Sequence, residues 1–486
     1  MPSPKRKLKR TAAAIQFPGI ALFAICLCFA SQSSPAQPTK ESRKKPVEVV
    51  KPREEGIKFQ PDKTYDLGSL INLGLGNNPY TQVAWQNARA SAAAVGEARA
   101  PYYPKAGLHV EGGSDRGYTT AVTGPDYFTR VNIAPAIVLE YLLVDFGRRD
   151  ADLQRTLHAL DAANLSYNRT MQRTVFAIQR SYFAHNAALW QEKAATANLE
   201  LARTISAMVT ERMKSGLATQ PEMLLATKTL AQAQFDREEA LRKTKTTLGQ
   251  LRTAVGVSAN LPLKITTLMP PSSYQELQGK LDKLIDSALV NRPDLAARIA
   301  DLRAREAATR RAKADFLPKI RLDGELRNDT FGYRAQTSTA SGTYSGNQNQ
   351  YGAFVVVDWD LFDGFERVER VKRKTAEEQG ARAEVEIERL DTILDVWTSY
   401  YNTATARRRV DYAESLLLSS QETFNALQAS FNEGLATITE LAAAQNDLSS
   451  ARFERANADS EYLTSVAALT LAMGTTPQTA GNPTPK

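Results

Sequence analysis

The 486-residue chain repeats one structural unit, and this duplication limits its possible folds more than any other feature. At an offset of 214 residues, ten positions between Leu75 and Lys105 match their counterparts between Leu289 and Lys319. At an offset of 218, Gly216-Leu217-Ala218-Thr219 recurs as Gly434-Leu435-Ala436-Thr437. A register that stays constant over most of the chain indicates a true duplication. The two copies are therefore expected to fold into the same order of elements.

The duplication and the local composition divide the chain into segments. Repeats separated by Pro-rich or polar stretches are typical of structural units joined by linkers. The predicted segments are a signal peptide at 1–36, a Pro- and Lys-rich linker at 37–64, the first structural repeat at 65–256, an inter-repeat linker at 257–276, the second structural repeat at 277–474 and a disordered tail at 475–486.

The net charge of +8, from 61 Lys and Arg against 53 Asp and Glu, lies outside the two repeats. Residues 1–36 carry five basic residues and no acid, and residues 37–61 carry seven basic and four acidic residues. Residues 62–486 therefore have no net charge. The charge gives no reason to expect a nucleic-acid partner.

The N-terminal segment has the pattern of an export signal. Basic residues at 5–10 precede the apolar core Ile20–Ala30, and either Ser34-Pro35-Ala36 or Cys28-Phe29-Ala30 fits a cleavage site. The core is too short to span a bilayer comfortably. We therefore predict a cleaved signal rather than an N-terminal anchor. Ile25 and Leu27 precede the two cysteines where lipidation needs a small residue, which argues against a lipid anchor.

Residue usage argues against an enzyme. Cys26 and Cys28 are the only cysteines, and both lie in the predicted signal, so the exported chain would have no disulfide and no thiolate metal site. The three histidines, His109, His158 and His185, are scattered, and the last two are expected on helix surfaces. The sequence has no H-E-x-x-H, G-x-S-x-G or P-loop motif. We predict no catalytic residues, no cofactor and no metal.

Each repeat contains a very long helix. No proline occurs between Gly147 and Pro221, so a helix of about 67 residues is expected over 147–213, roughly 100 Å long at ~1.5 Å per residue. That length exceeds any compact globular domain. An Ala- and Arg-rich helix (about 79–100 and about 293–314) begins each repeat, and another helix follows the turn after each long helix.

Two β-hairpins lie between these helices. Apolar residues alternate with polar ones in four segments, as in strands with one apolar face: 106–113, 129–143, 319–327 and 351–361. Loops are predicted at 114–127 and 328–350, which are rich in Gly, Ser, Thr and Asn. The strands could form a soluble sheet. In lipid, an open sheet edge is forbidden and ~8 strands is the smallest usual barrel, so several chains would have to share one barrel.

The helix that ends the second repeat is predicted to pack through a coiled-coil seam. Its apolar positions follow 3-4 spacing with many small side chains, which favours close packing: Leu441, Ala444, Leu448, Ala451, Ala458 and Tyr462. Arg455 interrupts this seam, and the sequence offers no reason for it. The aromatic group Trp397, Tyr400 and Tyr401 is interpreted as core packing.

The two Gly-Leu-Ala-Thr turns have complete helix-end chemistry. Each has a glycine suited to a left-handed helix end, a threonine suited to an N-cap, and a glutamate that completes a T-x-x-E capping box. These residues are Gly216, Thr219 and Glu222 in the first repeat, and Gly434, Thr437 and Glu440 in the second. At the strand–helix joints, Asp145 and Asp363 suit helix N-termini, where a negative charge is favourable. These helix-capping roles account for the residues without assigning them any further function.

The same residues resemble those of the TolC-type outer-membrane factors, the outer membrane efflux protein family. The resemblance spans about 65–474 and rests on the duplicated order and the two Gly-Leu-Ala-Thr turns. It also rests on Asn-Arg-Pro-Asp-Leu at 291–295, on Phe316-Leu317-Pro318, and on Leu361-Phe362-Asp363-Gly364 before a long helix.

This resemblance implies a mainly α fold with a membrane β-barrel part. Four strands per chain would close as a trimeric 12-stranded barrel, continued by long coiled helices as an α-helical tunnel. The family is a homotrimeric exit duct in the cell outer membrane, with its helical part in the periplasm. It works with a periplasmic adaptor (membrane fusion) protein and an inner-membrane pump of the RND, ABC or MFS type. The implied function is passive export in a tripartite efflux pump or a type I secretion system.

The resemblance also assigns roles to the turns. Gly216, Leu217, Ala218 and Thr219, with Gly434, Leu435, Ala436 and Thr437, would contact the adaptor. Glu222 and Glu440 would form a periplasmic gate, and three chains would place six carboxylates there, which favours cations. Ala443 stands where the family often has a further acid, which implies a less acidic gate.

One alternative is a periplasmic coiled-coil adaptor or scaffold without a membrane pore. It predicts one helical hairpin and a separate β-domain, and it leaves the duplicated strands unexplained. The sequence does not identify the exported substrate.

Overall fold

The computed structural model describes residues 60–121, 124–268, 280–336 and 341–475, all within one compact unit, Lys51–Lys486. The predicted signal peptide lies outside these residues. So do most of the linker at 37–64, part of the inter-repeat linker and nearly all of the tail.

The duplication is visible in the order of elements. The first repeat contains β1 (Thr64–Tyr65), α2 (Leu67–Asn77), α3 (Pro79–Arg99), the 3-10 helix η1 (Ala100–Tyr102), β2 (Lys105–Ala121), β3 (Gly124–Val144), α4 (Arg148–Lys214) and α5 (Gln220–Val255). After β4 (Lys264–Ile265), the second contains α6 (Leu281–Asn291), α7 (Pro293–Ala314), β5 (Lys319–Gln336), β6 (Ser341–Asp358), α8 (Glu366–Asn432) and α9 (Ile438–Ala472). Both α4 and α8 have 67 residues, which confirms the predicted long helices.

The short helices α2 and α6 were not predicted from the sequence. Each has 11 residues and ends two residues before a proline, Pro79 or Pro293. Proline disfavours the helical conformation of the residue before it, so each short helix stops there and a new helix begins.

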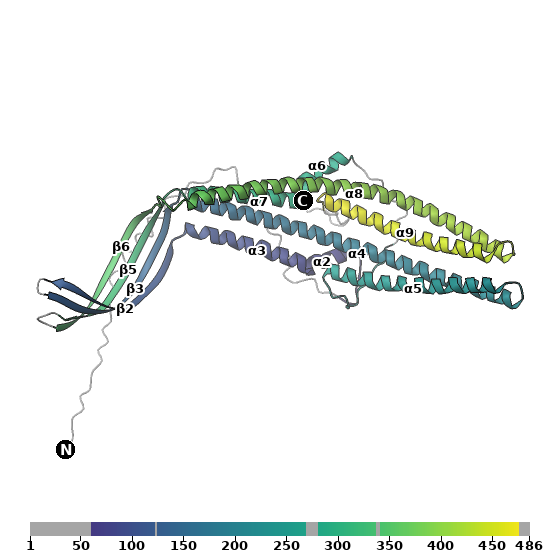
Figure 1. The fold of residues 1–486 in the computed structure, drawn as a ribbon, viewed down its shortest axis with the longest axis horizontal. Helices are drawn as coiled ribbons and strands as arrows, with labels where there is room; N and C mark the ends of the chain where they lie inside the picture. Colours follow the sequence, from purple (N-terminus) through teal and green to yellow (C-terminus); the bar gives the residue numbers. More distant parts are fainter. Residues whose placement is uncertain (1–59, 122–123, 269–279, 337–340, 476–486) are drawn as a thin grey trace, which may run out of the picture. The chain divides into compact units, whose positions relative to one another are not determined.

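The long helices are flanked by shorter ones placed end to end. Helix α4 packs against α3 and α5, and α8 packs against α7 and α9, as Figure 1 shows. Helix α4 also contacts α7 and α9, so it joins the two repeats. The helical part is therefore a layer with first-repeat helices at one edge and α8 at the other.

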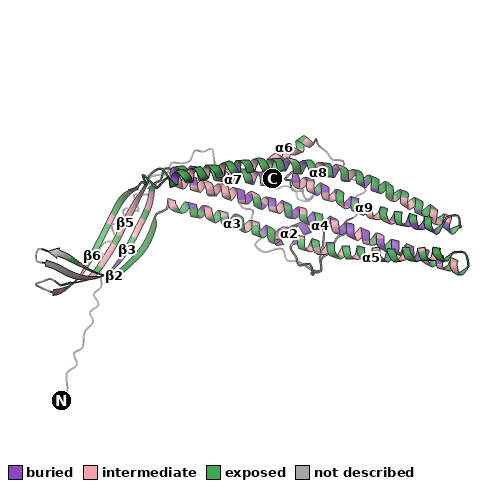
Figure 2. Cartoon of the chain, in the orientation of Figure 1, coloured by how far each residue is buried: buried purple, intermediate pink, exposed green. Residues whose placement is uncertain are grey.

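Small and apolar side chains hold this layer together. The predicted seam of α9 is buried, with Leu441, Leu448 and Ala451 fully inaccessible, and Figure 2 shows buried residues along its length. Arg455 is explained by its partners: its Nε lies 3.1 Å from Oδ2 of the buried Asp459, and its Nη1 donates to Glu414 of α8 at 2.9 Å. A buried charge is tolerated when it is paired and hydrogen-bonded.

The last helix of each repeat is followed by a glycine that lies against the backbone near the start of the same repeat. Gly256 ends α5 with φ +83°, and a Cβ there would lie 2.7 Å from the Asn78 Cα. Gly474 follows α9 with φ +73°, and a Cβ there would lie 2.8 Å from the Arg292 Cα. Only glycine fits a left-handed conformation and so close a backbone approach. In the second repeat Gln172 of α4 also donates to the Gly474 carbonyl at 2.7 Å.

The four long strands form one antiparallel sheet in the order β2-β3-β5-β6. The register pairs Leu108 with Ile137, Ile137 with Leu326, and Leu322 with Val355, so apolar side chains share one face. Among the described residues no helix is long and apolar enough to cross a membrane.

The strands are longer than predicted. Strand residues are found at 114–121, 124–127, 328–336 and 341–350, where loops were expected. β2 and β3 pair as far as Ala121 with Gly124, and β5 and β6 as far as Gln336 with Ser341. The apolar alternation stops earlier because the outer parts of the strands carry polar side chains. Cross-strand bonds continue there, such as Asn328 Nδ2 to Asn347 Oδ1 at 2.7 Å.

The prediction that His185 lies on a helix surface was wrong, because other helices cover α4 on more than one side. Its side chain is buried, and its Nδ1 lies 3.0 Å from the Thr247 Oγ1. Burial lowers the pKa of His185 below 6.5. The unfolded chain therefore takes up the proton more readily than the folded chain, and stability falls as the pH drops below about 6.5.

We expect the thermal unfolding midpoint to fall by several degrees between pH 7 and pH 5, and His185→Gln to reduce that fall. Circular dichroism at each pH measures both proteins. An identical pH dependence in the variant would show that His185 does not contribute.

Candidate functional site

The two turns at the end of the helical hairpins have the predicted backbone. Gly216 and Gly434 have φ of 73° and 80°. The Leu217 N–H donates to the Arg212 carbonyl at 2.8 Å, and the Leu435 N–H donates to the Ser430 carbonyl at 2.8 Å. These 6→1 bonds are those of a Schellman motif. The glycine prediction is confirmed in both repeats.

Each turn exposes a leucine. Leu217 is 78% exposed and Leu435 is 79% exposed. The alanines that follow, Ala218 and Ala436, instead pack against the apolar core near the turns. Each hairpin therefore offers one large apolar side chain that the described part of the chain does not bury.

The capping boxes are also confirmed. Oε2 of Glu222 accepts hydrogen bonds from the Thr219 N–H at 2.6 Å and from its hydroxyl at 2.8 Å. Oε2 of Glu440 accepts the same pair from Thr437 at 2.7 and 2.9 Å. These bonds lower the pKa of Glu222 and of Glu440, the backbone bond being the largest cause. Both carboxylates therefore stay charged at neutral pH.

Sequence reasoning missed Arg212. This residue lies in the last turn of α4, and its Nη2 donates to the carbonyls of Phe431 at 2.9 Å and Asn432 at 3.0 Å, at the end of α8. Its guanidinium also lies over the Phe431 ring, 4.5 Å from the centroid. The sequence feature that could have identified it is its position in the last turn of a helix, where a basic side chain interacts favourably with free carbonyl groups. What sequence could not show is that the carbonyls belong to the other hairpin.

The acids at the strand–helix joints act as predicted. Asp145 is buried, and its Oδ2 accepts from the Arg149 N–H at 2.7 Å. Oδ2 of Asp363 accepts from the Arg367 N–H at 3.1 Å and from its Nε at 2.6 Å. These contacts fix the first turn of each long helix and leave neither acid available for chemistry.

The same joints contain two strained residues. Phe146 and Phe365 have φ of 54° and 69°. A left-handed conformation costs a non-glycine residue roughly 1–2 kcal/mol.

The sheet has one apolar face and one charged face. Exposed apolar side chains on the first include Leu108, Val110, Val131, Ile133, Ile137, Tyr351, Val355 and Val357. On the opposite face Arg130 pairs with Asp329 at 2.6 Å, and Arg321 lies 3.6 Å from Glu140 and 3.1 Å from Asp358. A sheet with these two faces suits lipid on one side and an aqueous lumen on the other.

A second exposed apolar surface runs along α8. Its residues follow 3-4 spacing and are defined here as the α8 stripe: Ile387, Leu390, Leu394, Trp397 and Tyr401. Trp397 is 49% exposed, and Tyr401 is exposed to the same degree. The prediction that Trp397 and Tyr401 belong to the core of the chain was therefore wrong for the isolated chain.

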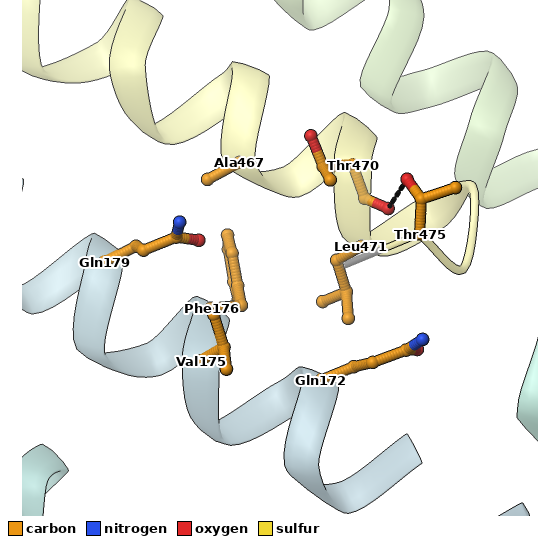
Figure 3. A pocket seen from close by; sticks show the side chains of 8 residues that line it. All are labelled: Gln172, Val175, Phe176, Gln179, Ala467, Thr470, Leu471 and Thr475. Carbon is orange, nitrogen blue, oxygen red and sulfur yellow. Dashed lines mark hydrogen bonds between the residues drawn. The ribbon is translucent and has the colours of Figure 1, made fainter. Parts of the chain in front are cut away.

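The hollow drawn in Figure 3 lies between α4 and α9. Phe176, Val175 and Leu471 line it, and Thr475 donates from Oγ1 to the Thr470 carbonyl at 3.3 Å on its rim. Its volume of about 10 Å³ leaves room for about one water molecule. The hollow is a packing defect between two helices and does not suggest a ligand.

Comparison with known proteins covers almost all of both repeats. The family model described as "Outer membrane efflux protein" matches residues 70–257 and 284–475. Protein CyaE of Bordetella pertussis is 27% identical over 417 residues, 85% of each chain. Outer membrane protein OprJ of Pseudomonas aeruginosa is 24% identical over 378 residues, 76% of each chain.

Solved structures share the fold. A membrane protein from Pseudomonas aeruginosa superposes with a TM-score of 0.72 at 21% identity, over 84% of this chain and 93% of that one. The outer-membrane channel OprN gives 0.71 at 20% identity, over 84% and 89%. The CmeC outer membrane channel of Campylobacter jejuni gives 0.68 at 17% identity, over 84% and 85%.

Proposed function

Because the chain belongs to the outer membrane efflux protein family, we propose that three copies form the exit duct of a tripartite efflux pump or a type I secretion system. The protein is an outer-membrane channel component and not an enzyme, and its helical part lies in the periplasm. The alternative of a periplasmic adaptor without a pore does not account for a sheet with a continuous exposed apolar face.

The observation that carries the proposal is that the sheet is open at both edges. β2 from the first repeat forms one edge and β6 from the second forms the other. In lipid these edges must be paired, because no water is present to bond their backbone groups. Joining β6 of one copy to β2 of the next is a head-to-tail contact, which gives a ring when the rotation between copies closes. Three copies give twelve strands.

The helical layer supports the same closure. The α8 stripe lies at the second-repeat edge of the layer, as β6 lies at the second-repeat edge of the sheet. Helix α3 at the opposite edge carries small residues on its exposed side, among them Ala90, Ala93 and Gly96. Large side chains of one copy would pack against small ones of the next, as in closely packed helical seams.

The turns are the part of the duct that would meet the adaptor. Leu217 and Leu435 are exposed apolar side chains at the ends of rigid hairpins, which suits contact with a helical partner. The adaptor would in turn connect the duct to an inner-membrane pump of the RND, ABC or MFS type.

Glu222 and Glu440 would line the periplasmic entrance of the trimer. Six carboxylates in a narrow mouth favour cations. Arg212 holds the two hairpins of one copy together beside them, so opening the mouth by separating the hairpins would require its bonds to Phe431 and Asn432 to break.

We expect the channel to select cations in planar bilayers, and Glu222→Gln with Glu440→Gln to reduce that selectivity several-fold. The amide oxygen can still accept the threonine bonds, so the caps remain. Because the pKa values of both acids lie below 4.5, the selectivity of the wild-type channel should hold from pH 7 to about pH 5 and fall only below that. Glu238→Gln, an exposed acid on α5, is the control. Unchanged reversal potentials in the double variant would rule out this gate.

A further inference from the structure

The duplication relates the contact between the two repeats to the contact between copies of the chain. Within one chain, β3 of the first repeat pairs with β5 of the second, and α4 packs against α7 and α9. Moved on by one repeat, these contacts join β6 to β2 of the next copy, and α8 to α3 and α5 of that copy. The interface of α4, which the structure shows, is therefore a template for the interface of α8.

The α8 stripe aligns with the face of α4 that the second repeat covers. At the offset of 218, three stripe residues fall on buried α4 residues that contact α7 or α9 or lie beside α9. These pairs are Ile387 with Arg169, Leu390 with Gln172, and Trp397 with Gln179. The α4 members are all polar and the α8 members are all apolar, so the two interfaces differ in chemistry.

The contact within the chain is charged. Arg169 Nε lies 2.9 Å from Oδ2 of Asp294 on α7, and Arg169 Nη1 donates to the Leu471 carbonyl of α9 at 2.9 Å. Arg292 contacts the same Asp294 oxygen at 2.7 Å and donates from Nη1 to Asp395 at 2.9 Å. The side chains of Arg169 and Arg292 are only 8% and 2% exposed. These buried charges are tolerated because each has a partner of opposite charge.

The equivalent contact between copies is apolar. Asp294 aligns at the offset of 214 with Tyr80 on α3, which is 77% exposed, and Arg169 aligns with Ile387, which is 58% exposed. Val83, one turn along α3 from Tyr80, is 60% exposed. The template therefore places Ile387 against Tyr80 of the next copy, where the chain itself has an ion pair.

A second position differs in size. Gln179 of α4 and Ala467 of α9 both line the hollow of Figure 3. They align at the offset of 218 with Trp397 and Gly249. A Cβ added at Gly249 would lie 4.0 Å from the Ala259 Cβ, so this side of α5 has room for a large neighbour. The Trp397 ring therefore has a glycine opposite it, as in closely packed helical seams.

Charged residues beside these positions are complementary. Arg311 Nε lies 3.6 Å from Oδ1 of Asp152, between α7 and α4, and Gln191 donates to Asn457 at 2.6 Å, between α4 and α9. Moved on by one repeat, the two contacts become pairs of opposite charge between copies: Arg370 with Glu97, and Arg409 with Glu239. All four side chains reach the surface of the single chain. Both pairs keep the register of the template.

We propose that this difference in chemistry makes each interface selective: α4 accepts α7 and α9 of its own chain, and α8 accepts α3 and α5 of the next copy. The selecting pairs between copies are Ile387 with Tyr80 and Trp397 with Gly249. If α8 took α7 of another chain instead, Ile387 would cover Asp294 without an arginine. An unpaired buried carboxylate disfavours that arrangement. The proposal rests on the ring of copies proposed above and names the residues that join its members.

The first test is cross-linking through cysteines. Trp397→Cys with Gly249→Cys, treated with a short bismaleimide in detergent, should give a covalent trimer on a denaturing gel. The equivalent pair Gln179→Cys with Ala467→Cys should react within one chain and give no covalent trimer. Trp397→Cys with Arg242→Cys, two helical turns away, controls the register, and each single-cysteine variant controls the background.

Native mass spectrometry before the reaction shows whether each cysteine variant forms a trimer. A trimer in which the cysteines at 397 and 249 stay unlinked would overturn the proposal and leave the exit duct unaffected. A wild-type protein that forms no ring would overturn both.

The second test moves the charged pair into the contact between copies. Ile387→Arg alone and Tyr80→Asp alone should each lower the fraction of trimer several-fold, because each buries an unpaired charge. Ile387→Arg combined with Tyr80→Asp reproduces the contact of Arg169 with Asp294 and should recover most of the trimer. Helicity by circular dichroism shows whether all three variants fold.

Recovery in the combined variant requires that residues 387 and 80 meet across the interface. Ile387→Arg with Val83→Asp is the matched control and should recover less trimer. A combined variant no better than the single ones would overturn the proposal, and so would single variants that assemble as the wild type does. Either result leaves the wild-type trimer, and with it the exit duct, unaffected.

Discussion

Leu394→Asp with Trp397→Asp is expected to leave the protein as separate chains that form no channel. Both side chains lie on the exposed α8 stripe, which the trimer would bury against the next copy. Burying a large apolar side chain contributes about 1.5–3 kcal/mol, and an unpaired buried carboxylate costs several more. Each of the three interfaces carries the change. The loss of association free energy is therefore expected to dissociate the trimer.

Native mass spectrometry of the detergent-solubilised protein measures this loss as the fraction of trimer, which should fall from nearly all to nearly none. Leu394→Met with Trp397→Phe keeps the stripe apolar and should assemble normally. Helicity by circular dichroism shows whether the aspartate variant still folds. A stable trimer of the aspartate variant would mean that the α8 stripe does not form the interface between copies.

The second large effect is expected at the turns. Leu217→Trp with Leu435→Trp should reduce pump-dependent export by at least about tenfold, because both leucines are exposed and a larger side chain disrupts a closely fitted contact. The left-handed glycines and the capping boxes are untouched, so the hairpins should fold as before.

Export from intact cells and recovery of the adaptor with the duct after cross-linking measure the contact directly. Conductance of the purified variant in planar bilayers should match wild type, which separates a lost partner from a damaged duct. Leu217→Ile with Leu435→Ile is the conservative control. Full export in the tryptophan variant would show that the turns do not contact the adaptor.

The features predicted correctly from sequence are those set by local chemistry. Glycine at a left-handed position, threonine three residues before glutamate, and a long stretch without proline specify their structures almost independently of the rest of the chain. For this reason Gly216, Gly434 and both capping boxes were predicted residue by residue. The capping aspartates Asp145 and Asp363 belong to the same class.

The features missed depend on what lies beside a residue in space. His185 was expected at the surface because nothing in its local sequence shows that α4 has neighbours on more than one side. Arg212 bonds carbonyls some 220 positions further along the chain. The strand ends at 114–121 and 328–336 carry polar side chains, so the alternation that identified the strands does not reach them.

Trp397 shows a different limit. Its large apolar side chain at heptad spacing predicts burial, but in the single chain the side chain is 49% exposed. Periodicity identifies a buried face and does not say which chain covers it.

We propose that three chains together close one barrel and one tunnel. Single-particle imaging of the purified protein in lipid nanodiscs tests it most directly, because it shows the sheet edges and the symmetry together. We expect a threefold particle in which β6 of each chain pairs with β2 of the next to give twelve continuous strands. A particle of another symmetry, or one in which β2 and β6 stay unpaired within the membrane, would contradict it.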